Sequence, residues 1–264
     1  MDIIQTLILA IIQGITEWLP ISSSGHLAIA QKYFNIKSTL TFDIALHVGT
    51  ILVVLVTFRR DIIAILKAVF RLDFKSEEGK LALFIIVGSL PTAIIGFLLL
   101  YFDIAETIFS NMLIVGAALL FTGSVLYVSK YAKNGKQLNY LDSLLIGIAQ
   151  GIATVPGISR SGFTISTGLL RKLQKEKAFK YSFLLSIPAV LGAMVATIIK
   201  EHEELTAGNL EFGSMIIGAI ASFVIGYIAL KLLQKIFIKQ KFHLFAYYCW
   251  IIGLLTIFLY FYCL

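Results

Sequence analysis

Long apolar runs recur along this 264-residue chain, and they restrict its fold more than any other feature. Six runs are 17 to 21 residues long, close to the roughly 20 residues that a helix needs to cross a bilayer. They are continuous rather than alternating, which excludes a transmembrane β-barrel. With 58% hydrophobic and 14% charged residues, the composition also excludes a soluble globular domain and a disordered chain. The predicted spans are Phe42–Phe58, Leu81–Tyr101, Met112–Val128, Phe179–Ile199, Met215–Leu233 and Phe245–Leu264.

The positive charges are clustered, which predicts the orientation of the spans. Of the 22 Lys and Arg residues, 18 lie in four short segments, whereas two other loops are acidic. Because cytoplasmic loops are enriched in Lys and Arg, we expect the basic segments inside and the acidic loops outside. This accounts for the net charge of +7 without a nucleic acid partner. The basic segments are residues 59–80, 129–140, 171–180 and 231–241, and the acidic loops are residues 102–110 and 200–211.

Two further apolar regions, Ile3–Tyr33 and Leu141–Leu170, are each interrupted in the middle. Glu17–Gly25 interrupts the first and Pro156–Gly162 the second, which leaves arms too short to span a bilayer. Basic segments flank the second region, so it enters and leaves from the cytoplasmic face, as a re-entrant hairpin or as two short crossings. The span Phe42–Phe58 then runs from the outside to the inside, so the first region, if it is also a hairpin, enters from the outside. Since irregular backbone at membrane depth is tolerated only against protein or a polar cavity, two broken hairpins predict a shared, buried polar site.

The two interrupted regions resemble each other, which indicates an internal repeat. Gln13–Gly25 and Gln150–Gly162 align without gaps at an offset of 137, with seven of 13 positions identical. Each copy precedes three spans, and an odd number of crossings inverts the second copy, as in many transporters. We therefore expect an all-α polytopic membrane protein with six transmembrane helices and two re-entrant helix–loop–helix hairpins, about ten helices. It forms a single membrane domain, residues 1–264, with repeats 1–130 and 138–264.

Arg160 is the clearest functional candidate, because ionisable residues inside a membrane segment are costly. No acidic residue lies within ten positions of it in the sequence. It therefore requires an anion, either the oxygens of a phosphate, which suit its planar fork, or Glu17 in a structural ion pair. Ser159, Ser161 and Gly162 beside it allow a turn whose N–H groups face a phosphate at the start of a helix.

The first interruption contains the other candidates for chemistry. A hydroxyl near the imidazole of His26 is a nucleophile–base arrangement, and Glu17 can orient the histidine, hold a cation or exchange protons. Gln13 lies one turn before Glu17 on the same helix face and can contact a ligand or pack. Further candidates for phosphate binding are Ser22, Ser24 and Gly25.

Two weaker candidates are a pair of polar residues at the start of a span and an amphipathic segment in a basic loop. Asp43 and His47 are four positions apart at the start of a span, where they would form either a mutual hydrogen bond or a supporting contact to the site. Residues 62–70 have the pattern of an interfacial amphipathic helix on the cytoplasmic face.

At these positions the chain resembles the BacA/UppP family of undecaprenyl-pyrophosphate phosphatases. The family's first motif is Glu/Gln-x-x-x-Glu followed by Pro-x-Ser-Ser-x-Gly-His, which here runs from Gln13 to His26. Its second motif, Pro-Gly-x-Ser-Arg-Ser-Gly, matches Pro156 to Gly162. The length and hydropathy agree along essentially the whole chain.

The resemblance implies an enzyme that removes the terminal phosphate of undecaprenyl pyrophosphate, which recycles the lipid carrier for peptidoglycan and confers bacitracin resistance. It implies functional roles for Glu17, Ser23, His26 and Arg160, and a divalent cation, Mg²⁺ or Ca²⁺, with Glu17 as a ligand. Attack by Ser23, by His26 or by water remains open. Many family members have Glu at the position of Gln13, which leaves Glu17 as the main titrating carboxylate here.

The resemblance also implies partners and a location. We expect a polyprenyl pyrophosphate lipid as substrate and a bacterial plasma membrane as environment, with the active site open to the outer face, and the resemblance allows a homodimer. The inverted repeat supports a second hypothesis, a lipid-phosphate transporter or flippase.

Overall fold

The computed structural model describes residues 2–36, 38–102, 111–132, 135–200 and 212–262. These residues form helices, with one isolated bridge between Lys136 and Leu173, which confirms the all-α class. Five helices are long and apolar enough to cross a bilayer. They are α5 (Glu77–Tyr101), α7 (Met112–Val128), α10 (Lys175–Lys200), α12 (Phe212–Ile238) and α13 (Phe245–Tyr262).

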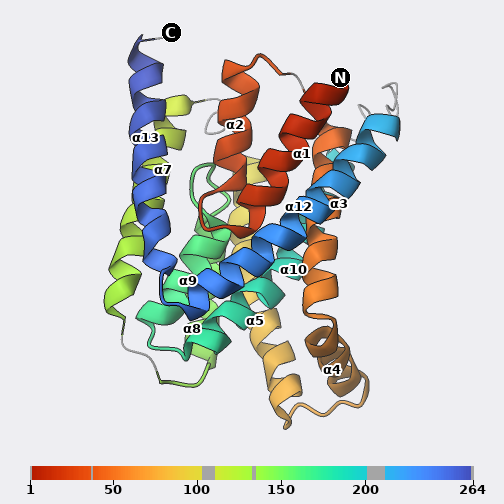
Figure 1. Ribbon diagram of the computed structural model, residues 1–264. Helices are drawn as coiled ribbons and strands as arrows, with labels where there is room; N and C mark the ends of the chain where they lie inside the picture. The colour runs from red at the N-terminus through yellow and green to blue at the C-terminus, as the bar shows by residue number, and fades with distance from the viewer. Residues whose placement is uncertain (1, 37, 103–110, 133–134, 201–211, 263–264) are drawn as a thin grey trace.

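The sixth predicted span is α3 (Leu40–Thr57), which is bent by 78° into α4 (Arg59–Phe70). The bend falls at Phe58, where the apolar run meets Arg59 and Arg60. Figure 1 shows α4 at one end of the molecule, with the start of α1 and the end of α13 at the other. Residues 62–70 thus form part of a separate helix, as expected, and its location at the membrane interface remains a prediction.

The two interrupted regions each form a pair of short helices. The first pair is α1 (Ile3–Trp18) and α2 (Ser23–Tyr33), and the second is α8 (Tyr140–Ile152) and α9 (Arg160–Leu170). In Figure 1, α1 and α2 lie in the half of the molecule that contains the ends of the chain, and α8 and α9 lie in the other half.

The two repeats interlock rather than pack as separate units. Helix α1 packs on α12, whereas its counterpart α8 packs on α5, and α7 packs on α13. Each hairpin therefore lies against a long helix of the other repeat. The exact repeat limits, 1–130 and 138–264, remain a prediction. The acidic loops 102–110 and 200–211 fall outside the described residues except for their first positions, as do the last two residues of the span predicted over Phe245–Leu264.

A buried charge cluster joins the two ends of the second hairpin. Asp142, which is 0% exposed, accepts from Lys136 Nζ at 2.8 Å and from Arg171 Nε at 2.9 Å. Lys136 also bonds through its backbone to the segment after α9, where its N–H donates to Lys172 O at 2.9 Å. Two of the basic residues counted as an orientation signal thus neutralise a buried carboxylate.

The tips of the two hairpins meet inside the protein. Gly157 N donates to Ser22 Oγ at 3.0 Å, and Ser161 Oγ donates to Trp18 O at 3.1 Å. Gly157 has a φ of +96°, in the region that favours glycine, and it lies against the backbone of α7. The contact between the tips therefore depends on a residue without a side chain.

Replacing Gly157 tests this contact. A Cβ atom there would lie 2.5 Å from Val115 O and 2.7 Å from Ala118 Cβ. For Gly157→Ala we expect the free energy of unfolding to fall by roughly 2–4 kcal/mol, because a left-handed conformation and overpacking are both penalised. Thermal unfolding in detergent measures the loss. Gly192→Ala on α10 is the matched control, because its Cβ would meet nothing within 4 Å; an equal melting temperature for the two variants would contradict the prediction.

Candidate active site

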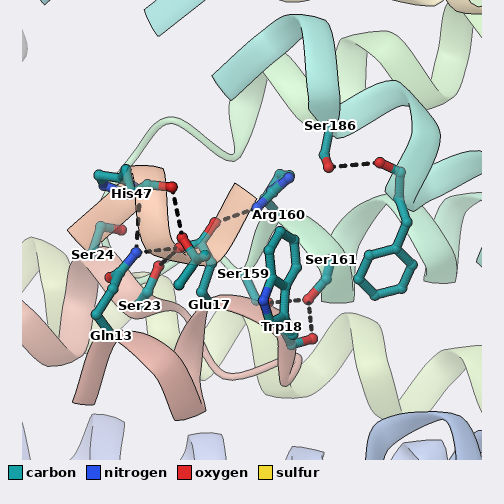
Figure 2. A network of polar contacts seen from close by, with 12 residues as sticks. Gln13, Glu17, Trp18, Ser23, Ser24, His47, Ser159, Arg160, Ser161 and Ser186 are labelled. Carbon is teal, nitrogen blue, oxygen red and sulfur yellow. Dashed lines mark hydrogen bonds and ion pairs between the residues drawn. The ribbon is translucent and has the colours of Figure 1, made fainter. Parts of the chain in front are cut away.

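Glu17 lies at the centre of the polar site where the hairpin tips meet (Figure 2). It is in the last turn of α1, and its carboxylate Oε1 forms an ion pair with Nη2 of Arg160, the first residue of α9. Its other oxygen, Oε2, accepts from Ser23 Oγ at 2.5 Å and from Gln13 Nε2 at 3.1 Å. Three elements from two distant parts of the sequence therefore bring their polar side chains to one carboxylate.

The Glu17–Arg160 pair is largely shielded from solvent. The side chain of Glu17 is 7% exposed and that of Arg160 is 15% exposed. The guanidinium carbon of Arg160 lies 5.2 Å from the centre of the Trp18 ring, a cation–π distance. Its second terminal nitrogen, Nη1, is buried and has no hydrogen-bond partner among the described residues. Arg160 thus satisfies Glu17 and keeps donor capacity for a further anion.

Gln13 links Glu17 to α3. Its Nε2 lies 3.1 Å from Glu17 Oε2 and 3.1 Å from His47 Nδ1. Asp43 does not share this link, since its Oδ2 accepts from Ser38 Oγ at 3.0 Å. Of the two sequence-based alternatives for Asp43 and His47, the described contacts favour a supporting contact from His47 to the site over a mutual hydrogen bond.

Three of the candidate phosphate-binding serines form structural hydrogen bonds at the hairpin tips. Ser22 and Ser159 are the N-caps of α2 and α9, and each accepts from the N–H three residues later, that of Gly25 and that of Gly162. Ser161 donates to the backbone of the opposite tip. The capping bonds explain why these positions are identical in both copies, because an N-cap hydroxyl satisfies an otherwise unpaired helix N–H.

His26 lies apart from the Ser23–Glu17 contact. Its Nδ1 is 2.7 Å from Ser22 O and its Nε2 is 2.9 Å from the hydroxyl of Tyr248 on α13. Among the described residues, no hydrogen bond joins His26 to Ser23. The structure thus pairs the hydroxyl of Ser23 with a carboxylate and not with the imidazole that the sequence suggested.

A cavity of about 410 Å³ lies beside the site. It extends from Ser24 at the start of α2 to Lys32 near its end, and it is bordered by the first turns of α3 and α7. Those first turns lie at the end of the molecule that contains the start of α1 and the end of α13 (Figure 1). Its lining residues are Ser24, Leu27, Ala28, Gln31, Lys32, Asp43, His47 and Met112.

The donor atoms near Glu17 suit a hard divalent cation, although the described residues contain no group of three or more His, Cys, Asp or Glu side chains that could hold a metal. Mg²⁺ is commonly held by one or two carboxylates together with substrate phosphates. Beside Glu17, the amide oxygen Oε1 of Gln13 is buried without a partner among the described residues. A carboxylate and an amide oxygen therefore fit such an ion, even though Gln13 cannot titrate.

Two contacts of the site, His26 with Tyr248 and Gln13 with His47, join residues that are distant in the sequence. Tyr248 lies in an ordinary apolar run and carries no motif, so no local signal marks it. The spacing of His47 from Asp43 marks it as a candidate, but its link to Gln13 spans 34 positions and depends on how α3 packs on α1.

Comparison with known proteins adds independent evidence. Residues 6–255 match the family model described as "Bacitracin resistance protein BacA". Proteins named undecaprenyl-diphosphatase from Korarchaeum cryptofilum and Halothermothrix orenii are 43% and 42% identical to this chain, over 96% and 98% of its length and 98% of theirs. One from Desulforapulum autotrophicum is 40% identical over 97% of this chain and 98% of its own. With its two hairpin motifs and a family match over nearly the whole length, the chain belongs to the bacitracin resistance protein BacA family.

Proposed function

We propose that this protein is an integral-membrane phosphatase that hydrolyses undecaprenyl pyrophosphate to undecaprenyl phosphate and inorganic phosphate. The observation that carries the proposal is the buried Arg160, which is paired with Glu17 and retains an unpartnered donor at Nη1. The names of the relatives supply the substrate. In this role the protein recycles the lipid carrier for peptidoglycan synthesis and confers bacitracin resistance.

Arg160 binds the pyrophosphate in this scheme, and the cavity admits the head group. A guanidinium in a largely buried site interacts strongly with phosphate oxygens, because little water competes for its N–H groups. The cavity lining combines Ser24, Gln31 and Lys32 with the apolar Leu27 and Met112, as a charged head group on a prenyl chain requires. When substrate binds, its phosphates take over part of the role that Glu17 has in the substrate-free site.

Ser23 is the nucleophile that the contacts favour. Its Oγ attacks the terminal phosphorus, its proton passes to Glu17 Oε2, and the bond from phosphorus to the bridging oxygen breaks, which releases undecaprenyl phosphate. Water then attacks the phosphoserine and gives its proton to His26 Nε2. The phosphorus–Oγ bond breaks, Glu17 returns the proton to Ser23, and inorganic phosphate leaves. The 2.5 Å contact between Ser23 and Glu17 supports the first proton transfer.

A divalent cation, Mg²⁺ or Ca²⁺, would be held by the Glu17 carboxylate and the Gln13 amide oxygen together with phosphate oxygens. When bound, it neutralises charge on the phosphates as the phosphorus–oxygen bond breaks. His47 then serves to orient Gln13, because the amide nitrogen of Gln13 already faces the imidazole.

The site opens to the outer face of the plasma membrane in this proposal. The cavity lies between α2 and the first turns of α3 and α7, at the end of the molecule opposite α4. The basic segment 59–80 contains α4, and such segments are cytoplasmic by the positive-inside rule. The homodimer that the resemblance allows remains a prediction.

Phosphate release by the purified protein is the first test. In detergent micelles with undecaprenyl pyrophosphate, we expect inorganic phosphate to be released, EDTA to abolish the release, and Arg160→Ala to lower kcat by about 10²-fold or more. Thermal unfolding of Arg160→Ala controls for folding. A lipid transporter would release no phosphate in micelles, so absence of release by the wild-type protein would overturn the proposal in favour of the transporter hypothesis.

Trapping of the phosphorylated enzyme identifies the nucleophile. With substrate labelled in its terminal phosphate and rapid acid quenching, we expect an acid-stable phosphoserine on the wild-type protein and none on Ser23→Ala. Ser24→Ala is the matched control and retains the label. Phosphohistidine, trapped under alkaline conditions, would assign the attack to His26, and the absence of any covalent label would assign it to water.

Labelling of introduced cysteines in intact cells tests the orientation. In a chain with Cys249 and Cys263 replaced by Ser, we expect a membrane-impermeant thiol reagent to label Lys32→Cys, which lines the cavity. Lys239→Cys, which lies in a basic segment, is expected to react only after the cells are opened. The reverse pattern would place the cavity on the cytoplasmic face.

A further inference from the structure

His26 is held by two hydrogen bonds that together define its protonation. Its Nδ1 lies 2.7 Å from the carbonyl oxygen of Ser22, which can only accept, so Nδ1 carries the proton. In a neutral imidazole Nε2 then has the lone pair, and the hydroxyl of Tyr248, 2.9 Å away, donates to it. The two rings are also stacked, with centroids 5.6 Å apart and planes inclined by 13°. The carbonyl of Ser22 therefore sets the tautomer, and Tyr248 holds the plane of the imidazole and the direction of its Nε2 lone pair.

The next residue on α13 anchors Tyr248 against the first hairpin. Cys249 is fully buried, and its Sγ lies 3.6 Å from Pro20 O in the turn between α1 and α2. Helix α13 also packs along α7 over much of its length. Tyr248 itself is 40% exposed, so it lies at the edge of the protein while its backbone is held in place.

The equivalent place in the second repeat shows that packing does not require this polar pair. Phe163 occupies the position of His26, and its ring meets Phe121 of α7 edge-on, with centroids 5.6 Å apart. Two phenyl rings thus form the contact between α9 and α7 at this position. In the first repeat, His26 and Tyr248 are instead joined by a hydrogen bond. Packing of the two rings does not by itself require this bond.

We propose that Tyr248 is a positioning residue for the phosphatase reaction, which keeps the Nε2 atom of His26 unprotonated and fixes its direction. A water molecule that approaches Nε2 replaces the tyrosine hydroxyl as the donor and meets an imidazole that is already in the reactive tautomer. This inference rests on the proposed role of His26, because Tyr248 acts on the reaction only through that ring.

A double-mutant cycle on phosphate release tests the inference. Tyr248→Phe retains the stacked ring and removes the hydroxyl, so we expect kcat to fall by roughly 10- to 100-fold, as for loss of one strong hydrogen bond, with little change in KM. In a His26→Ala background the same substitution is expected to change kcat by less than about twofold, since coupled residues are not additive. Tyr247→Phe, which alters the neighbouring exposed tyrosine, is expected to match the wild-type protein.

The outcomes separate the inference from the proposed function. Full kcat for Tyr248→Phe, or the same loss in both backgrounds, would overturn the role of Tyr248. Full activity of His26→Ala would instead overturn the role of His26. Nitrogen NMR of the imidazole provides a readout independent of turnover and of any stability loss in the variants. We expect the wild-type His26 signal, assigned with His26→Ala, to show a protonated Nδ1 and an unprotonated Nε2, and the opposite tautomer would overturn the inference.

Discussion

The ion pair between Glu17 and Arg160 is the interaction on which the rest of the site depends. Either group alone would be an uncompensated charge in a largely buried, poorly hydrated site. Loss of either residue would therefore leave its partner buried without a counter-charge. Glu17 also lies at the C-terminal end of α1, where the helix dipole disfavours a negative charge. Arg160, at the N-terminal end of α9, compensates for both effects. The two hairpins must therefore meet at their tips.

Around this pair the protein uses one backbone design twice with different side chains. Ser22 and Ser159 cap equivalent helices through the same hydrogen bond. The functional positions have diverged: Thr154, the counterpart of Glu17, donates to the backbone of its own helix at 2.8 Å. One copy supplies the carboxylate, hydroxyl and imidazole, and the other supplies the cation. The polar cluster around Glu17 therefore forms where the two hairpin tips face each other.

Small residues let the hairpins approach the long helices closely enough to be held rigidly. Gly14 on α1 and Gly151 on α8 are equivalent positions, and a Cβ atom at either would come within 3.0 Å of an isoleucine on the facing helix, Ile225 or Ile95. Helices in membranes associate largely through such close packing, since lipid provides no hydrophobic driving force between them. The apolar arms thereby hold the hairpins against α12 and α5, in addition to the polar contacts that join the tips.

The sequence by itself determined the apolar spans and the two interrupted regions, and it marked Glu17, Ser23, His26 and Arg160 as candidates for the site. These follow from hydropathy, charge asymmetry and motifs, which are local properties of the chain. Only the tertiary structure decided which of these residues touch. In the structure, Ser23 contacts Glu17. His26 contacts Tyr248, 222 positions away, and Gln13 contacts His47, 34 positions away. Such partners depend on how α3 and α13 pack against the first hairpin, and no pattern within a single helix records that packing.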